Sequence, residues 1–158
     1  MRALSLPRRG GAALAAVAVV ALFAAAAGAH SNARFYRGEI AASTSWDGVI
    51  RLTGTVVIRE QVTVTVDPGT EVLVQPGVGA GIVVKGRLLV RGTGARPVVF
   101  DAAGGCREGS WDGIVFAPGS TGVLEDSRIR CSSGGVGGDL SGVTRRGVSV
   151  EPGPRSSQ

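Results

Sequence analysis

The chain has few of the residue types on which helical proteins and many enzyme active sites depend. Its 158 residues include one histidine, His30, and only 4% aromatic residues. Because His30 stands alone at the start of the predicted mature chain, histidine-based catalytic triads and most zinc sites are excluded. Glycine, with 26 residues, is too frequent for a coiled coil or a helical bundle. Its irregular spacing excludes collagen.

Positive charge is not concentrated in any part of the mature chain. Lysine and arginine number 17 against 12 acidic residues, which gives a formal net charge of +5. Arg2, Arg8 and Arg9 lie in a segment that we expect to be removed, and the remaining arginines are scattered. Nucleic-acid-binding proteins cluster their basic residues on one surface. The sequence therefore predicts no nucleic-acid partner.

Residues 1–29 have the pattern of a secretory signal peptide. Basic residues come first, an apolar run follows from Gly11 to Ala26, and Ala27-Gly28-Ala29 has the small residues that a signal peptidase needs. An uncleaved membrane anchor is the alternative, and it would be the chain's only contact with a membrane. We predict a secreted or cell-surface protein, periplasmic in a two-membrane bacterium, with residues 30–45 as an N-terminal lead-in.

Two cysteines, Cys106 and Cys131, occur in the predicted mature chain. An even cysteine count in an exported protein indicates a disulfide. If the two residues pair, their Cα atoms should lie within about 7 Å of each other. The alternative is a pair of thiols too far apart to meet.

The mature chain alternates short apolar runs with Gly and Pro turns. Val62–Val66 places valine and threonine strictly in turn, which is typical of a strand with valine facing the interior. Pro68-Gly69 ends that run, and similar short runs continue to Phe116. The fold class predicted is all-β, built of short strands. The same alternation places Leu73 and Leu89 on the outer face.

Strands this short bury little apolar surface unless they stack, and a parallel β-helix stacks them. Local sequence echoes favour successive circuits of about 21–22 residues. We expect the circuits over residues 46–131 and a Gly/Ser/Arg-rich tail over 132–158, with one last strand at 147–150. The echoing segments are Trp46–Ile50 with Trp111–Val115, and Val64–Gly69 with Val148–Gly153.

The stretch from Gly38 to about Cys131 resembles the N-terminal part of bacterial exported right-handed parallel β-helix proteins. The resemblance implies a right-handed solenoid in a surface or secreted domain, and related folds include polysaccharide-acting lyases and hydrolases. This chain is much shorter, and its single asparagine, Asn32, cannot build the internal asparagine ladder of many β-helices. The matching segments are Ser45-Trp46, Gly54–Val56, Val64–Val72, Gly86–Thr93, Pro97–Phe100 and Trp111–Phe116.

Four residues are candidates for carbohydrate contact: Trp46 and Trp111 as stacking rings, and Asp112 and Asp126 as acidic partners. The alternative is that the tryptophans pack inside the circuits and the carboxylates are ordinary surface groups. No residue is assigned a catalytic role, and no cofactor is expected. Gly134–Asp139 matches most of one calcium-binding repeat, but Ser141 stands where an apolar residue is needed and a calcium site needs several copies, so no metal site is predicted.

The sequence favours a non-catalytic secreted or cell-surface module with a structural or binding role. The alternative is a polysaccharide lyase or hydrolase of the β-helix class, truncated or remnant. A hydrolase would use paired carboxylates as acid and base, and a lyase would use stacked carboxylates that hold calcium together with an arginine base. The expected partners are an extracellular polysaccharide or a surface protein. An uncovered last circuit would also leave unpaired backbone groups, which predicts that the chain self-associates or docks on a partner through its C-terminal circuit.

Overall fold

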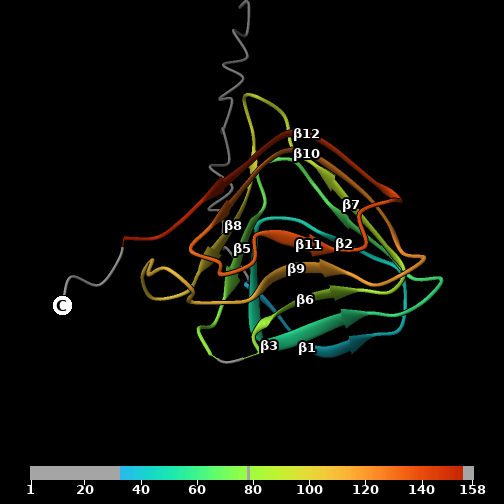
Figure 1. Cartoon of the computed structure of the whole chain (residues 1–158), viewed down its shortest axis with the longest axis horizontal. Coiled ribbons are helices and arrows are strands. Elements are labelled where there is room, and N and C mark those ends of the chain that lie inside the picture. The colour runs from blue at the N-terminus through green and yellow to red at the C-terminus, as the bar shows by residue number, and fades with distance from the viewer. Residues whose placement is uncertain (1–32, 78, 155–158) are drawn as a thin grey trace, which may run out of the picture.

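The computed structural model describes residues 33–77 and 79–154, and this part of the chain consists of strands and turns without a helix (Figure 1). The predicted signal peptide, residues 1–29, lies outside the described residues. Every strand pair is parallel, so the all-β prediction is confirmed and the strands form one parallel sheet system. The strands are β1 (Arg34–Ile40), β2 (Thr44–Trp46), β3 (Val49–Ile58), β4 (Thr63–Val66), β5 (Glu71–Val74), β6 (Gly81–Val84), β7 (Arg87–Arg91), β8 (Val98–Ala102), β9 (Gly113–Phe116), β10 (Thr121–Arg130), β11 (Val136–Gly138) and β12 (Val143–Glu151).

The strands form three parallel stacks that the chain visits in rotation. The first stack contains the start of β1 and of β3, then β5, β8 and the ends of β10 and β12. The second contains the ends of β1 and β3, then β6, β9 and β11. The third contains β2, β4, β7 and the starts of β10 and β12. We call one passage through the three stacks a circuit and the turns between stacks corners.

The interior is built from rows of side chains in which each circuit covers the one before it. Ile50, Val72, Phe100 and Ile129 occupy successive positions of one row in the first stack, and each is 0% exposed. Burying an aliphatic or aromatic side chain of this size contributes about 1.5–3 kcal/mol. The predicted alternation also holds, because the valines of Val62–Val66 are buried and the threonines are half-buried.

Three strands are much longer than expected, because each continues around a corner. β3 and β10 have 10 residues and β12 has 9. In β10 and β12 a single residue in the left-handed region makes the bend, Asp126 with φ 38° and Gly147 with φ 62°. Figure 1 shows both strands arching over one corner of the molecule. One residue per corner is enough, so the strand on either side keeps its pairing.

The strands extend beyond the predicted range of 46–131. β1 and most of β2 lie in the lead-in, and β11 and β12 lie in the segment predicted as a tail. The high glycine content that indicated a tail has a packing cause instead. A Cβ atom on Gly138 would lie 2.1 Å from the carbonyl oxygen of Phe116 in the neighbouring circuit. Only glycine allows that approach.

The sequence echoes do not mark equivalent positions of successive circuits. The first Trp-Asp-Gly leads into β3, where Ile50 belongs to the first stack, whereas the second leads into β9, where Ile114 belongs to the second. The repeat length also varies: residues bonded across adjacent circuits are 20 apart at Ser43 and Thr63 but 34 apart at Arg87 and Thr121. The echoes reflect similar corner chemistry. The predicted spacing of about 21–22 residues holds between some adjacent circuits, as at Ile50 with Val72 and Ile129 with Val150, but not throughout.

Candidate functional site

A notch lies at the corner between the second and third stacks, and its origin is a difference in turn length. The turn between β6 and β7 has only Lys85 and Gly86, whereas residues 59–62 and 117–120 form the equivalent turns of the adjacent circuits. The short turn is set back between the longer ones and leaves an open cavity of 680 Å³. We call this cavity the Lys85 notch; it is lined by Glu60, Gln61, Val62, Thr63, Lys85, Gly86, Arg87, Ala117, Pro118, Gly119 and Thr121.

Backbone hydrogen bonds to both neighbouring circuits hold the floor of the Lys85 notch. The Lys85 N–H donates to the Ile58 carbonyl at 2.9 Å, and the Gly86 carbonyl accepts from the Thr121 N–H at 3.0 Å. A Cβ atom on Gly86 would lie 2.2 Å from the carbonyl oxygen of Arg59. The glycine therefore lets the circuits approach closely enough to form this floor.

The Lys85 notch carries positive charge on its floor and hydrogen-bonding groups on its walls. Lys85 and Arg87 are exposed, and the Arg87 Nε donates to the Thr121 hydroxyl at 3.1 Å. Glu60 adds one carboxylate to the wall, and an adjoining hollow of 430 Å³ continues past Glu60 to Glu39 and Arg59. Ammonium, guanidinium, amide and hydroxyl groups facing one open cavity can hold an anion that also carries hydroxyl groups.

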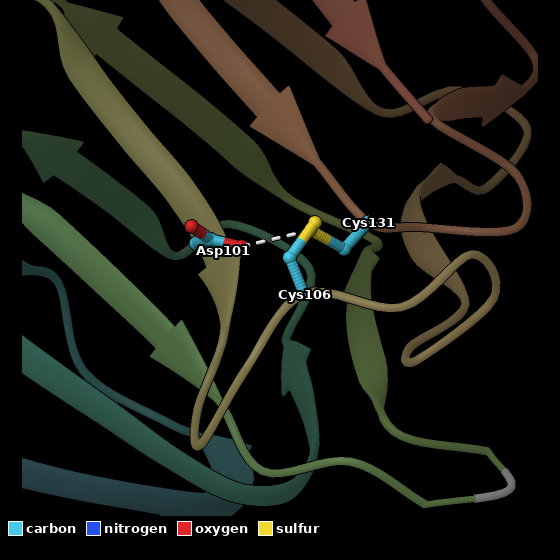
Figure 2. A group of neighbouring side chains, drawn as sticks. All are labelled: Asp101, Cys106 and Cys131. Carbon is cyan, nitrogen blue, oxygen red and sulfur yellow. Dashed lines mark hydrogen bonds between the residues drawn. A yellow bond between two sulfur atoms is a disulfide. The ribbon is translucent and has the colours of Figure 1, made fainter. Parts of the chain in front are cut away.

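The disulfide predicted from the sequence is present. Cys106 and Cys131 are bonded, with their Cα atoms 5.4 Å apart, so the expected separation is confirmed (Figure 2). Sγ of Cys131 lies 3.0 Å from Oδ1 of Asp101. Asp101 and the two cysteines together resemble a metal-ligand cluster. Because the two sulfur atoms are bonded to each other, neither is a thiolate that could bind a metal.

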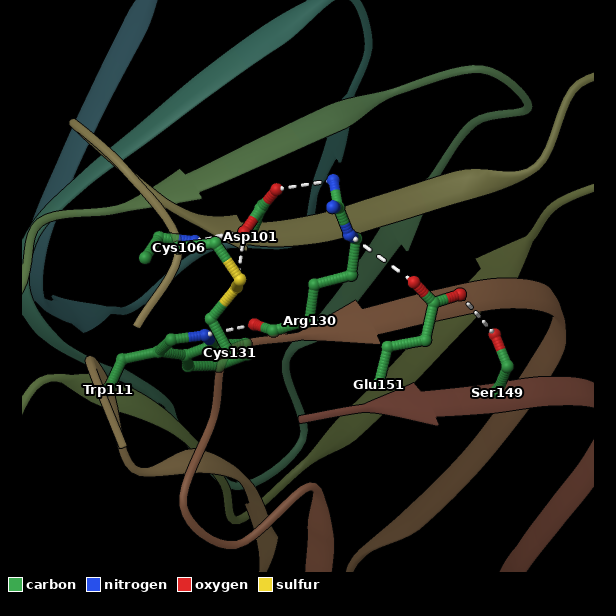
Figure 3. A network of polar contacts seen from close by, with 8 residues as sticks. Asp101, Cys106, Trp111, Arg130, Cys131, Ser149 and Glu151 are labelled. Carbon is green, nitrogen blue, oxygen red and sulfur yellow. Dashed lines mark hydrogen bonds and ion pairs between the residues drawn. A yellow bond between two sulfur atoms is a disulfide. The ribbon is translucent and has the colours of Figure 1, made fainter. Parts of the chain in front are cut away.

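A row of polar contacts beside the disulfide links three circuits (Figure 3). The Arg130 guanidinium lies 2.9 Å from an Asp101 carboxylate oxygen and 3.4 Å from a Glu151 carboxylate oxygen. The Arg130 carbonyl accepts a hydrogen bond of 2.8 Å from the Trp111 indole N–H. Asp101 is mostly buried, and its other oxygen accepts from the Ala102 N–H at 2.8 Å. Since these groups satisfy one another, the row ties circuits together.

The structure divides the four carbohydrate-contact candidates between two kinds of corner. Trp46 and Asp126 lie where the chain passes from the third stack to the first, and Trp111 and Asp112 lie where it passes from the first to the second. Both tryptophans are 0% exposed. Neither ring therefore offers a face on which a sugar could stack. Asp112 is exposed and Asp126 is half-buried at the bend of β10.

Sequence reasoning missed the Lys85 notch. Lys85 is the only lysine of the chain, but a lone cation between two apolar runs does not indicate a cavity. The available signal was the comparison of turn lengths, two residues between β6 and β7 against longer turns before and after. That comparison requires knowing which turns share a corner, and the repeat length inferred from the sequence did not identify those turns.

One carboxylate outside these sites has a perturbed titration. The side-chain hydroxyl and the backbone N–H of Ser141 donate hydrogen bonds that hold the pKa of Asp139 below its ordinary value. We expect an NMR titration of the Asp139 carboxyl to show a midpoint below that of an unstructured aspartate, and Ser141→Ala to move it partway back. Because the folded pKa is the lower one, the interaction is present above the unfolded pKa and lost as the pH falls through the folded value. An unchanged midpoint in Ser141→Ala would contradict this assignment.

No protein-family model matches the chain, and no curated protein or solved structure is significantly similar to it. The described part of the chain also contains no helix of the length and hydrophobicity that a membrane span requires. The functional interpretation therefore depends on the geometry of the chain's own residues.

Proposed function

We propose that this chain is a short right-handed parallel β-helix, exported from the cell, that acts as a non-catalytic binding module for anionic polysaccharide. The rotation of the chain through three parallel stacks supports the architecture. Crossovers between parallel strands are almost always right-handed, which supports the hand. The Cys106–Cys131 disulfide supports an oxidising compartment, as expected of a secreted or surface protein.

The observation that carries the binding role is the Lys85 notch. Its 680 Å³ lies within the range of about 300–1,000 Å³ typical of small-ligand pockets, enough for a few sugar units. Lys85 and Arg87 are placed to receive a carboxylate or sulfate, while Gln61, Thr63 and Thr121 supply donors and acceptors for hydroxyl groups. The notch is open to solvent at the outer surface, so a long polymer can cross it without threading.

We expect the full chain to bind a uronic-acid polymer more tightly than a neutral polymer of similar length. Lys85→Gln and Arg87→Gln should each weaken binding by about 10-fold, because each removes one charge-assisted contact. Arg128→Gln is the matched control, since Arg128 is an exposed arginine of the first stack. Isothermal titration calorimetry at two salt concentrations gives the affinities, and binding should weaken as salt rises.

Equal losses of affinity in the control and in the Lys85 notch variants would show that the notch is not part of the binding site. The same incubations are also assayed for new reducing ends and for unsaturated sugar products. Release of either product by the unmodified chain would favour the lyase or hydrolase alternative over a non-catalytic module.

A further inference from the structure

One edge of β12 has no partner strand within the described residues. β12 pairs with β10 along one side, and no strand among residues 33–77 and 79–154 pairs with its other side. The Glu151 carbonyl accepts from the Cys131 N–H at 2.9 Å, so Glu151 faces the β10 side. Because successive residues of a strand direct their backbone groups to opposite edges, the N–H and C=O of Val150 point to the open edge.

The interior is also incompletely covered at this edge. Val150 continues the row that contains Phe100 and Ile129, which are both 0% exposed, yet Val150 itself is 52% exposed. Val148, in the same strand, is half-buried against the interior. A strand of 9 residues with one unpaired edge beside exposed valine is a template for a further strand.

The charge of β12 decides which strand fits. Arg145 and Arg146 are both exposed and lie directly beside the bend at Gly147. An antiparallel pairing of two β12 strands centred on Arg146 would place the Arg146 side chains of the two copies directly opposite each other, and like charges across a strand pair are destabilising. Arg145 also occupies the row of Leu124, and a charge in an inward position is a known means of blocking edge-to-edge association. The edge therefore disfavours a second copy of this chain.

We propose that the open edge of β12 binds an extended acidic segment of another protein by strand addition. The segment's backbone pairs with the open edge, its apolar residues at alternate positions cover Val148 and Val150, and its acidic residues, on the outer face, lie beside Arg146. This inference is independent of the Lys85 notch, which lies at another corner.

The test uses the full chain and two synthetic nine-residue peptides, one alternating valine with glutamate and the other alternating valine with lysine. We expect the glutamate peptide to bind at least about 10-fold more tightly than the lysine peptide. The double variant Arg145→Gln/Arg146→Gln should lose at least about 10-fold in affinity for the glutamate peptide, whereas Arg128→Gln should not. Fluorescence anisotropy gives the affinities, and the Val150 amide should exchange more slowly with hydrogen when the peptide is bound.

A second variant separates strand addition from simple charge attraction. Val150→Pro removes the backbone donor at the open edge and retains both arginines, so it should abolish most binding. Circular dichroism checks the fold of each variant, and the arginine variant, altered only at exposed side chains, stands as the test if the proline variant unfolds. Three results would overturn the proposal: equal affinity for both peptides, a Val150 amide protected without peptide, or a dimer in sedimentation that forms through β12. A dimer formed through β12 would instead support self-association of the chain.

Discussion

Replacing Gly92 with alanine is expected to lower the free energy of unfolding by about 3 kcal/mol or more. Gly92 follows β7 at a corner, where its N–H donates to the Glu125 carbonyl of the next circuit at 3.0 Å. An added Cβ would lie 2.1 Å from the carbonyl oxygen of Asp126 and 2.6 Å from that of Glu125. These obstacles are backbone atoms, so relief requires the two circuits to separate. Urea denaturation of the two proteins measures the difference.

Gly94→Ala is the matched control, two residues further along the same turn. Its Cβ would meet nothing within 4 Å, and its φ lies outside the left-handed region. Alanine there should leave stability within about 0.5 kcal/mol or raise it slightly, because it reduces the entropy of the unfolded chain. Similar losses of stability at both positions would show that Gly92 does not stabilise the fold by allowing the two circuits to approach closely.

Removing the disulfide should have an effect of comparable size. The bond closes a loop with a sequence separation of 25, for which the loss of unfolded-chain entropy corresponds to about 3 kcal/mol. We expect the double variant Cys106→Ser/Cys131→Ser to unfold at a temperature lower by about 10 °C. Thermal unfolding followed by circular dichroism, on both proteins at the same pH, gives the shift.

Reductant provides the control for the disulfide prediction. A thiol reductant should lower the unfolding temperature of the unmodified chain to that of the double variant and leave the double variant unaffected. A reduced chain that remains as stable as the oxidised one would mean that contacts such as Asp101 with Arg130 hold this region without the crosslink.

The local features of the fold were predictable because they depend on neighbouring residues. The alternation over Val62–Val66 specifies which side chains face the interior, and the Pro-Gly turn at 68–69 marks where the strand run ends. The pairing of Cys106 with Cys131 followed from an even cysteine count in a chain predicted to be exported. Each inference needed only composition or a few consecutive residues, and the structure agrees with each.

The stacking register was not predictable by the same means. A Trp-Asp-Gly corner suits more than one edge of the cross-section, since a large apolar side chain fills the interior and glycine allows the left-handed turn at Gly48 and Gly113. Similar corners therefore do not identify similar circuits. The Lys85 notch depends on the register, because a short turn forms a cavity only between longer turns of adjacent circuits. The Lys85 notch could therefore not be predicted from the sequence without knowledge of the strand pairing.

The disulfide has a mechanical consequence when the molecule is pulled by its two ends. Circuits that no disulfide joins are expected to detach one after another under load, and each lengthens the chain as it detaches. The disulfide prevents the segment between Cys106 and Cys131 from being stretched. With a sequence separation of 25, this segment corresponds to roughly 85 Å of extended chain. Under tension the molecule would therefore reach a shorter final length when oxidised than when reduced, because the disulfide keeps one circuit closed.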